Sequence, residues 1–223
     1  MSANLMSLAR SGGKFLKLFG DRKMMKPLPY DAEVEYLEST GTQYIKTDII
    51  PAIGYTYKIM FRSTGVVDYG YLFGVNWRDD TGTANFFGLR RFISQSRFQA
   101  LGFSVGTVPY EEDVDYDITI NGGEAGNLNK FKLADGRVFS NNSKISVSPR
   151  LPMNLLAVNN IGGVAYQNKV LLYSFSIEAN SKTILDLIPV RVGDVGYMYD
   201  RISGKFFGNA GKGSFVIGPN KTI

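Results

Sequence analysis

An alternation of apolar and polar residues with a period of two constrains the fold of this chain more than any other feature of its sequence. In the segment 55–62, every second residue is apolar or aromatic, namely Tyr55, Tyr57, Ile59 and Phe61. This pattern is typical of a strand with one face buried and one face open to solvent. Comparable segments recur after residue 31, separated by Gly, Asn, Asp and Pro. We expect strands at Val34–Leu37, Tyr44–Thr47, Tyr55–Arg62, Tyr71–Val75, Asn85–Arg90, Phe98–Phe103, Tyr116–Ile120, Lys130–Leu133, Asn154–Val158, Leu171–Ile177, Ile184–Val190 and Phe215–Ile217.

No helical pattern of ten residues follows residue 30. About a dozen short strands with turn residues between them predict an all-β fold, a two-sheet antiparallel sandwich. Periodicity alone does not separate a sandwich from a closed barrel, so both architectures stay open at this stage.

The chain of 223 residues contains neither cysteine nor histidine. Disulfides, Cys/His zinc sites, Ser-His-Asp triads and histidine acid–base catalysis are therefore excluded. Without His or Cys, the plausible chemistry for hydrolysis is a pair of carboxylates, as glycosidases use. The nearest candidate is the acidic segment 111–117, where Glu111, Asp113, Asp115 and Asp117 alternate. We expect a solvated acidic strand edge there rather than a catalytic pair, and we expect no enzymatic activity.

The net positive charge of the chain, +5, lies entirely in its first 26 residues. This arm holds six of the 25 basic residues and one of the 20 acidic residues, which leaves 19 of each sign in the rest of the chain. A folded domain that binds nucleic acid would be expected to carry the basic excess itself. We therefore expect no nucleic acid among the partners.

Within the arm, Lys14, Phe15, Leu16, Lys17, Leu18 and Phe19 form a short apolar and basic stretch. No apolar run in the arm exceeds two residues, so we expect neither a transmembrane segment nor a secretory signal. Three interpretations remain: an anchor on a partner protein, a helix on a membrane surface, or an unstructured leader. We expect a partly helical anchoring arm at residues 1–30 and one β domain at residues 31–223.

Two blocks of sequence resemble a known family. Val34-Glu35-Tyr36-Leu37-Glu38-Ser39-Thr40-Gly41-Thr42-Gln43-Tyr44-Ile45 is similar to the opening of concanavalin A-like jelly-roll (laminin-G-like) domains. The closing stretch, from Ile188-Pro189-Val190-Arg191 through Gly196-Tyr197-Met198-Tyr199-Asp200-Arg201 to Gly211, is similar to their ending. Such domains are common in bacteriophage virion proteins and in surface proteins of gut bacteria. The resemblance implies a jelly roll whose first and last strands lie side by side.

The resemblance also implies a function. The first hypothesis is a non-enzymatic virion structural protein, a capsid decoration, head fibre or tail-associated protein. It would be assembled in the host cytoplasm and bound through its arm to other virion proteins, with the jelly roll displayed for adhesion to host glycans. The alternatives are a soluble lectin-like module and, more remotely, a glucanase-like hydrolase. Whether the domain forms a homo-oligomer stays open.

The candidate glycan site is a polar stretch that holds the single tryptophan of the chain, Asn76, Trp77, Arg78, Asp79 and Asp80. An exposed aromatic face stacks on the C–H face of a sugar, while planar polar groups bond its hydroxyls. Asp79 and Asp80 are also the candidate ligands for Ca²⁺, since calcium prefers oxygen donors. The alternative is a hairpin loop whose tryptophan covers the edge of the core. A second cluster, Arg90, Arg91 and Arg97, is expected to be a solvated strand edge or a protein contact.

Overall fold

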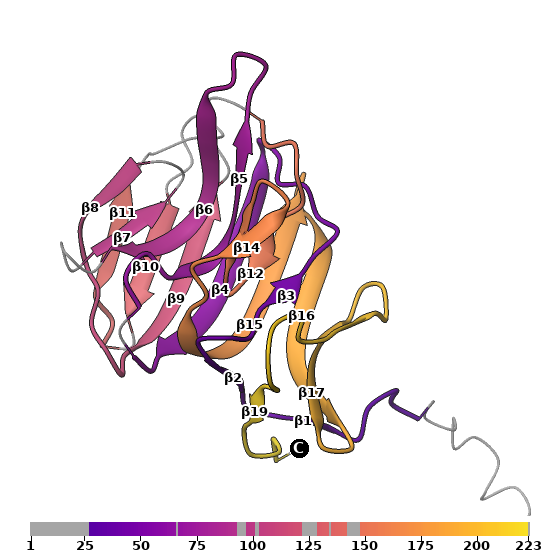
Figure 1. The fold of residues 1–223 in the computed structure, drawn as a ribbon. Coiled ribbons are helices and arrows are strands. Elements are labelled where there is room, and N and C mark those ends of the chain that lie inside the picture. Colours follow the sequence, from indigo (N-terminus) through magenta and orange to yellow (C-terminus); the bar gives the residue numbers. More distant parts are fainter. Residues whose placement is uncertain are drawn as a thin grey trace, which may run out of the picture.

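The computed structural model describes residues 27–65, 67–92, 97–100, 103–121, 129–133, 135–141 and 148–222. Among these residues there is no helix, and the chain folds into two β-sheets that face each other (Figure 1). The all-β, two-sheet sandwich expected from the alternation is thus confirmed. Residues 1–26 of the expected arm, including residues 14–19, lie outside the described residues, and the anchoring role stays a prediction. Tyr30, at the end of the expected arm, packs with Ile188 and Val190 of the β domain.

The larger sheet contains most of the strands in the second half of the chain. Its main path runs in the order β11-β10-β9-β4-β15-β16-β17-β18, with β1, β2 and β19 paired alongside. The strands of this sheet are β1 (Ala32–Glu33), β2 (Leu37–Thr40), β4 (Tyr55–Ser63), β9 (Asp115–Asn121), β10 (Asn129–Leu133), β11 (Val138–Asn141), β15 (Lys169–Ala179), β16 (Lys182–Val192), β17 (Val195–Asp200), β18 (Phe206–Phe207) and β19 (Val216–Ile217).

The smaller sheet follows the order β14-β13-β5-β6-β7-β8. Off this path, the short strand β12 pairs with β5 on one side and with β3 on the other. The β5–β6 hairpin extends beyond the rest of the sandwich (Figure 1). The strands of this sheet are β3 (Ile45–Lys46), β5 (Tyr71–Arg78), β6 (Ala84–Phe92), β7 (Arg97–Ala100), β8 (Phe103–Pro109), β12 (Asn154–Leu155), β13 (Val158–Asn160) and β14 (Gly163–Ala165).

The core lies between the two sheets and is rich in aromatic rings. On β4, Tyr57, Ile59 and Phe61 are fully buried, as the alternation predicts. They meet residues of the smaller sheet such as Phe73, whose ring centroid lies 5.6 Å from that of Tyr57. Burying side chains of this size supplies most of the stabilisation of a sandwich, at about 1.5–3 kcal/mol each.

The two ends of the domain pair with each other. β19 runs antiparallel to β2, and Val34 forms a bridge with Asn220. The expected neighbourhood of the first and last strands is therefore confirmed.

The expected acidic strand edge is wrong in its position. Strand β9, which carries Asp115 and Asp117, lies between β4 and β10 inside the larger sheet. Cross-strand partners, rather than exposure at an edge, accommodate its acidic side chains: Asp115 lies opposite Arg62 on β4, and Asp117 lies opposite Lys132 on β10.

Candidate functional site

The candidate glycan-binding stretch 76–80 does not form one surface. Strand β5 continues to Arg78, so the alternation that buries Phe73 and Val75 also turns Trp77 toward the core. The exposed fraction of Trp77 is 2%. Its ring offers no surface on which a sugar can stack, and the interpretation of Trp77 as an exposed binding platform does not fit this burial.

Arg78, Asp79 and Asp80 belong to the tip of the β5–β6 hairpin. One carboxylate oxygen of Asp79 accepts hydrogen bonds from the Thr81 side chain at 2.6 Å and from the backbone N–H groups of Thr81 and Thr83 at 2.9 and 3.0 Å. The bond from the Thr81 hydroxyl is the main reason that the pKa of Asp79 falls to about 2. Asp79 therefore shapes the turn.

Asp80, the other candidate calcium ligand, forms an ion pair with Arg150. Within the described ranges, no group of three or more Asp or Glu side chains lies close enough together to hold a metal ion. The Asp79–Asp80 pair thus has no third carboxylate beside it in the part of the chain that the structure describes.

Asn76, by contrast, faces away from the core. Its side-chain amide donates to the Asn160 side chain at 3.1 Å, and its oxygen lies 3.5 Å from the Tyr71 hydroxyl. Asn76 therefore marks the open face of the smaller sheet, and this face holds a cluster of aromatic side chains that the sequence analysis did not single out.

Arg90 on β6 is the centre of this aromatic cluster. Its guanidinium carbon lies 4.8 Å from the ring centroid of Phe86, 5.3 Å from that of Tyr69, 5.6 Å from that of Tyr71 and 5.8 Å from that of Phe92. Its Nε donates to the Gln99 side chain at 2.6 Å. A guanidinium so placed over ring faces is held by cation–π attraction as well as by hydrogen bonds.

Tyr166 completes the aromatic cluster and is its most accessible ring. It stacks on Tyr71 with a centroid distance of 6.2 Å and lies 6.1 Å from Tyr69. Its exposed fraction is 48%, whereas Tyr71 beneath it is only 1% exposed. We define Tyr69, Tyr71, Phe86, Arg90, Phe92 and Tyr166 as the aromatic face.

A glycine makes the aromatic face possible. A Cβ atom at Gly74 would lie 2.6 Å from the Tyr71 ring, so only glycine lets this ring lie flat on the strand. The sequence gives only a weak signal for Tyr166. Val164 and Tyr166 alternate after the glycine pair 162–163, but the segment is too short to predict a strand from this pattern.

A groove lies beside β14 on the same sheet, with a volume of about 410 Å³. It is lined mainly by polar residues of β3, of the segment that follows it, and of the β12–β14 region. The residues are Tyr44, Lys46, Thr47, Asp48, Pro152, Asn154, Asn159, Gly162, Gly163 and Val164. A volume above about 300 Å³ is in the range of small-ligand sites.

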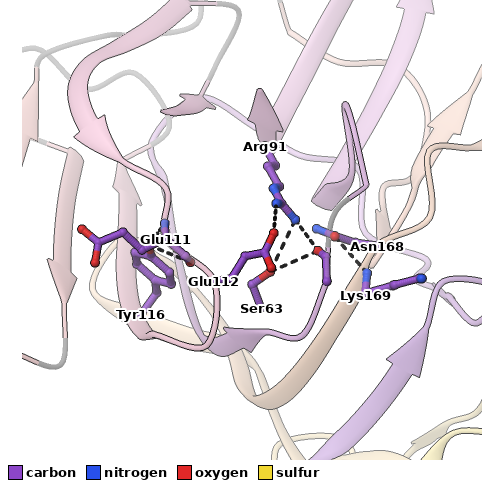
Figure 2. Close-up of polar contacts among 8 residues, drawn as sticks. Ser63, Arg91, Glu111, Glu112, Tyr116, Asn168 and Lys169 are labelled. Atoms are coloured by element: carbon purple, nitrogen blue, oxygen red, sulfur yellow. Dashed lines mark hydrogen bonds and ion pairs between the residues drawn. The ribbon is translucent and has the colours of Figure 1, made fainter. Parts of the chain in front are cut away.

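The expected solvated arginine edge is wrong for Arg91. Arg90 and Arg91 are adjacent on β6 and therefore face opposite sides of the sheet. Arg91 is 2% exposed, and its guanidinium donates to the Gly65 carbonyl, to the Ser63 hydroxyl at 3.5 Å and to Glu112 at 3.2 Å (Figure 2). It also lies 3.6 Å from the centroid of the Tyr110 ring. This arginine ties the two sheets together and is not a surface contact.

Three carboxylates of the acidic segment, those of Glu111, Glu112 and Asp115, form ion pairs with arginines. Arg62 binds both oxygens of Asp115, at 2.8 and 2.6 Å, and Tyr173 donates to one of them at 2.8 Å. The hydrogen bonds from Arg62 are the main cause of the lowered pKa of Asp115. Glu111 accepts from Arg137 at 3.0 Å. Asp115, with its pKa lowered by Arg62, is a poor proton donor, and proton donation is the role that glycoside hydrolysis requires of an acid with a raised pKa.

The described part of the chain has no helix with the length and apolarity that crossing a membrane requires. Comparison with known proteins yields no matching family model and no matching curated protein.

Proposed function

We propose that this chain is a non-enzymatic glycan-binding module of the concanavalin A-like jelly-roll type, displayed on a phage particle. The observation that carries the proposal is the aromatic face, with Tyr166 half exposed above a layer of packed rings. A pyranose presents C–H groups on one face and hydroxyls around its rim, so it fits an aromatic ring flanked by planar hydrogen-bonding groups. The planar groups of this face are Arg90, Gln99 and Asn76, which lie around Tyr71, the ring on which Tyr166 stacks.

The rigidity of the aromatic face supports the same function. Tyr71 is buried under Tyr166, and Arg90 is fixed by Gln99. Rings that are already held in place lose little conformational entropy when a ligand binds, which favours even a weak ligand. Repeated copies on a particle would convert a weak contact into useful avidity.

The virion setting rests on the resemblance to phage jelly-roll domains and on the uneven charge. The arm of residues 1–26 carries the whole basic excess, and the rest of the chain is balanced. A basic and apolar arm can bind a neighbouring virion protein. The domain, which has no net charge, would then be exposed on the surface of the particle. The second candidate, a soluble lectin-like module, uses the same aromatic face without an anchor.

Glycan-array binding of the full chain and of Tyr166→Ala tests the proposal. Losing the stacking contact is worth about 1 kcal/mol, so we expect about a fivefold loss of affinity. Phe206→Ala is the matched control, because Phe206 is 38% exposed but lies on β18 of the other sheet. Equal binding by the wild-type chain and Tyr166→Ala, or no glycan bound by the wild-type chain, would refute the assignment.

A further inference from the structure

The groove beside the aromatic face contains two kinds of polar side chain. Thr47 and Asn159 are occupied by the protein itself, because Thr47 donates to the Met153 carbonyl at 2.6 Å and Asn159 donates to the Pro152 carbonyl at 2.6 Å. Asn159 also accepts from the Gly162 N–H at 2.9 Å. These two residues hold the walls of the groove in place and have little capacity left for a ligand.

Asn154 belongs to the second kind. It is only 4% exposed, it lines the groove, and its side-chain amide has no hydrogen bond to any residue that the structure describes. Its backbone is held between β3 and β5, opposite Lys46 and Gly74. The side-chain polar atoms of Asn154 are not among the buried atoms that lack a partner, so the amide reaches the space of the groove and is open to a hydrogen bond from a ligand.

Lys46 lies directly across from Asn154 in the antiparallel pair of β3 and β12. Side chains opposite each other in such a pair have Cβ atoms about 5 Å apart, so the ammonium and the amide can reach the same ligand group. In the described part of the protein Lys46 has no carboxylate within ion-pairing distance. The acidic side chain that lines the groove, Asp48, lies 3.9 Å from Lys205 at the rim.

We infer that this groove binds the acidic sugar of a glycan, with the sugar carboxylate between Lys46 and Asn154. A carboxylate has two oxygens, and here one can accept from the ammonium and the other from the amide N–H. Asp48 lies 3.9 Å from Lys205, whereas Lys46 has no carboxylate within ion-pairing distance among the described residues, so the Lys46 ammonium is the cation that the groove offers to a ligand. This inference deepens the proposed glycan-binding function and rests on it.

The position of the groove fits a glycan longer than one sugar. Val164 lines the groove, and Tyr166, two residues further along the chain, belongs to the aromatic face. Strand β14 thus borders both features. One sugar on Tyr166 and an acidic sugar in the groove would be neighbouring parts of one chain of sugars.

The test compares binding of the full chain to a neutral oligosaccharide series, the same series with a terminal uronic or sialic acid, and the acidic series with its carboxylate blocked as a methyl ester. We expect the wild-type chain to bind the acidic series at least about fivefold more tightly than the other two. Lys46→Gln should lose this preference and keep the neutral binding. Lys182→Gln changes the net charge equally but lies on β16 of the larger sheet, so it should keep the preference.

Asn154→Ala separates binding from folding. The amide has no partner in the described part of the protein, so its removal should leave the melting temperature unchanged while acidic-glycan affinity falls about tenfold. Glycan binding without any preference for the acidic series, or with a preference that survives in Lys46→Gln, would overturn the inference and leave the proposed function intact. Failure of the wild-type chain to bind any glycan would overturn both.

Discussion

The indole of Trp77 is held by packing alone, because its buried Nε1–H has no acceptor within the described part of the protein. Trp77 therefore stabilises the core through the volume that its ring fills. A phenyl ring can supply much of that volume, and no hydrogen bond is lost in the exchange.

We expect Trp77→Ala to lower the free energy of unfolding by about 3–5 kcal/mol, and Trp77→Phe to lower it by about 1–2 kcal/mol. Urea denaturation measures both values. Trp77→Phe should bind glycans as the wild-type chain does. A folded Trp77→Phe that loses binding would show that the indole contacts the ligand after all.

The alternation of a strand determines which face a residue occupies only if the strand extends far enough to include that residue. The pattern of β5 predicts a strand over Tyr71–Val75, but pairing with β6 carries it to Arg78, and these added residues turn Trp77 inward. Counting in twos from Phe73 and Val75 would have indicated this orientation. Nothing local predicts Arg91 as buried, because its partners Ser63 and Glu112 are distant in the sequence.

At the scale of elements, the turn after β17 is built around one carboxylate. Asp200 is 1% exposed and accepts four hydrogen bonds, from the N–H groups of Asp186, Ile202 and Ser203 and from the Ser203 hydroxyl. Burial opposes its ionisation, but these bonds together outweigh burial and lower the pKa of Asp200. Asp200 thus joins β16, β17 and the turn that follows β17.

A lowered pKa in the folded state makes stability depend on pH. Asp200 contributes stability above the ordinary Asp pKa of about 4, and this contribution is lost as the pH falls through the folded-state value. Asp115 acts in the same direction, as does Asp79 with its pKa of about 2. We expect the free energy of unfolding to fall between about pH 4 and pH 2.

Asp200→Asn tests the contribution of this turn. An amide cannot accept at both ends, so the variant should lose about 1–3 kcal/mol at pH 7 and show a shallower loss of stability below pH 4. Denaturant unfolding at pH 7 and pH 3 measures both effects. An unchanged acid dependence would mean that Asp200 does not keep its lowered pKa in solution.

At the scale of the whole molecule, the two-sheet architecture follows from alternation along β4, β15 and β16, because one face of each strand must be buried. The aromatic face does not follow from it. Rings on that face come from β5 and the turn before it, from β6 and from the segment after β14, and only the packing of these segments brings Tyr69, Arg90 and Tyr166 together.

Deletion of residues 1–26 is the test at this scale. The described core begins at Tyr30, so we expect the truncated chain to keep its melting temperature within about 2 °C. Its net charge should fall from +5 to zero, which isoelectric focusing measures. Glycan binding should persist, whereas incorporation into particles should be lost. A truncated chain still incorporated at the wild-type level would remove the arm from the attachment mechanism.

The pairing of β2 with β19 also determines how the domain responds to mechanical force. The bonds that join the two ends, such as that from the Lys221 N–H to the Glu33 carbonyl at 2.9 Å, lie between antiparallel segments that enter and leave at the same place. A pull between residues 31 and 221 would break them one after another, at low force, before the central strands are loaded. A force applied between residue 31 and a bound glycan would not unzip this pairing of the two ends. It would act on the packed sandwich instead.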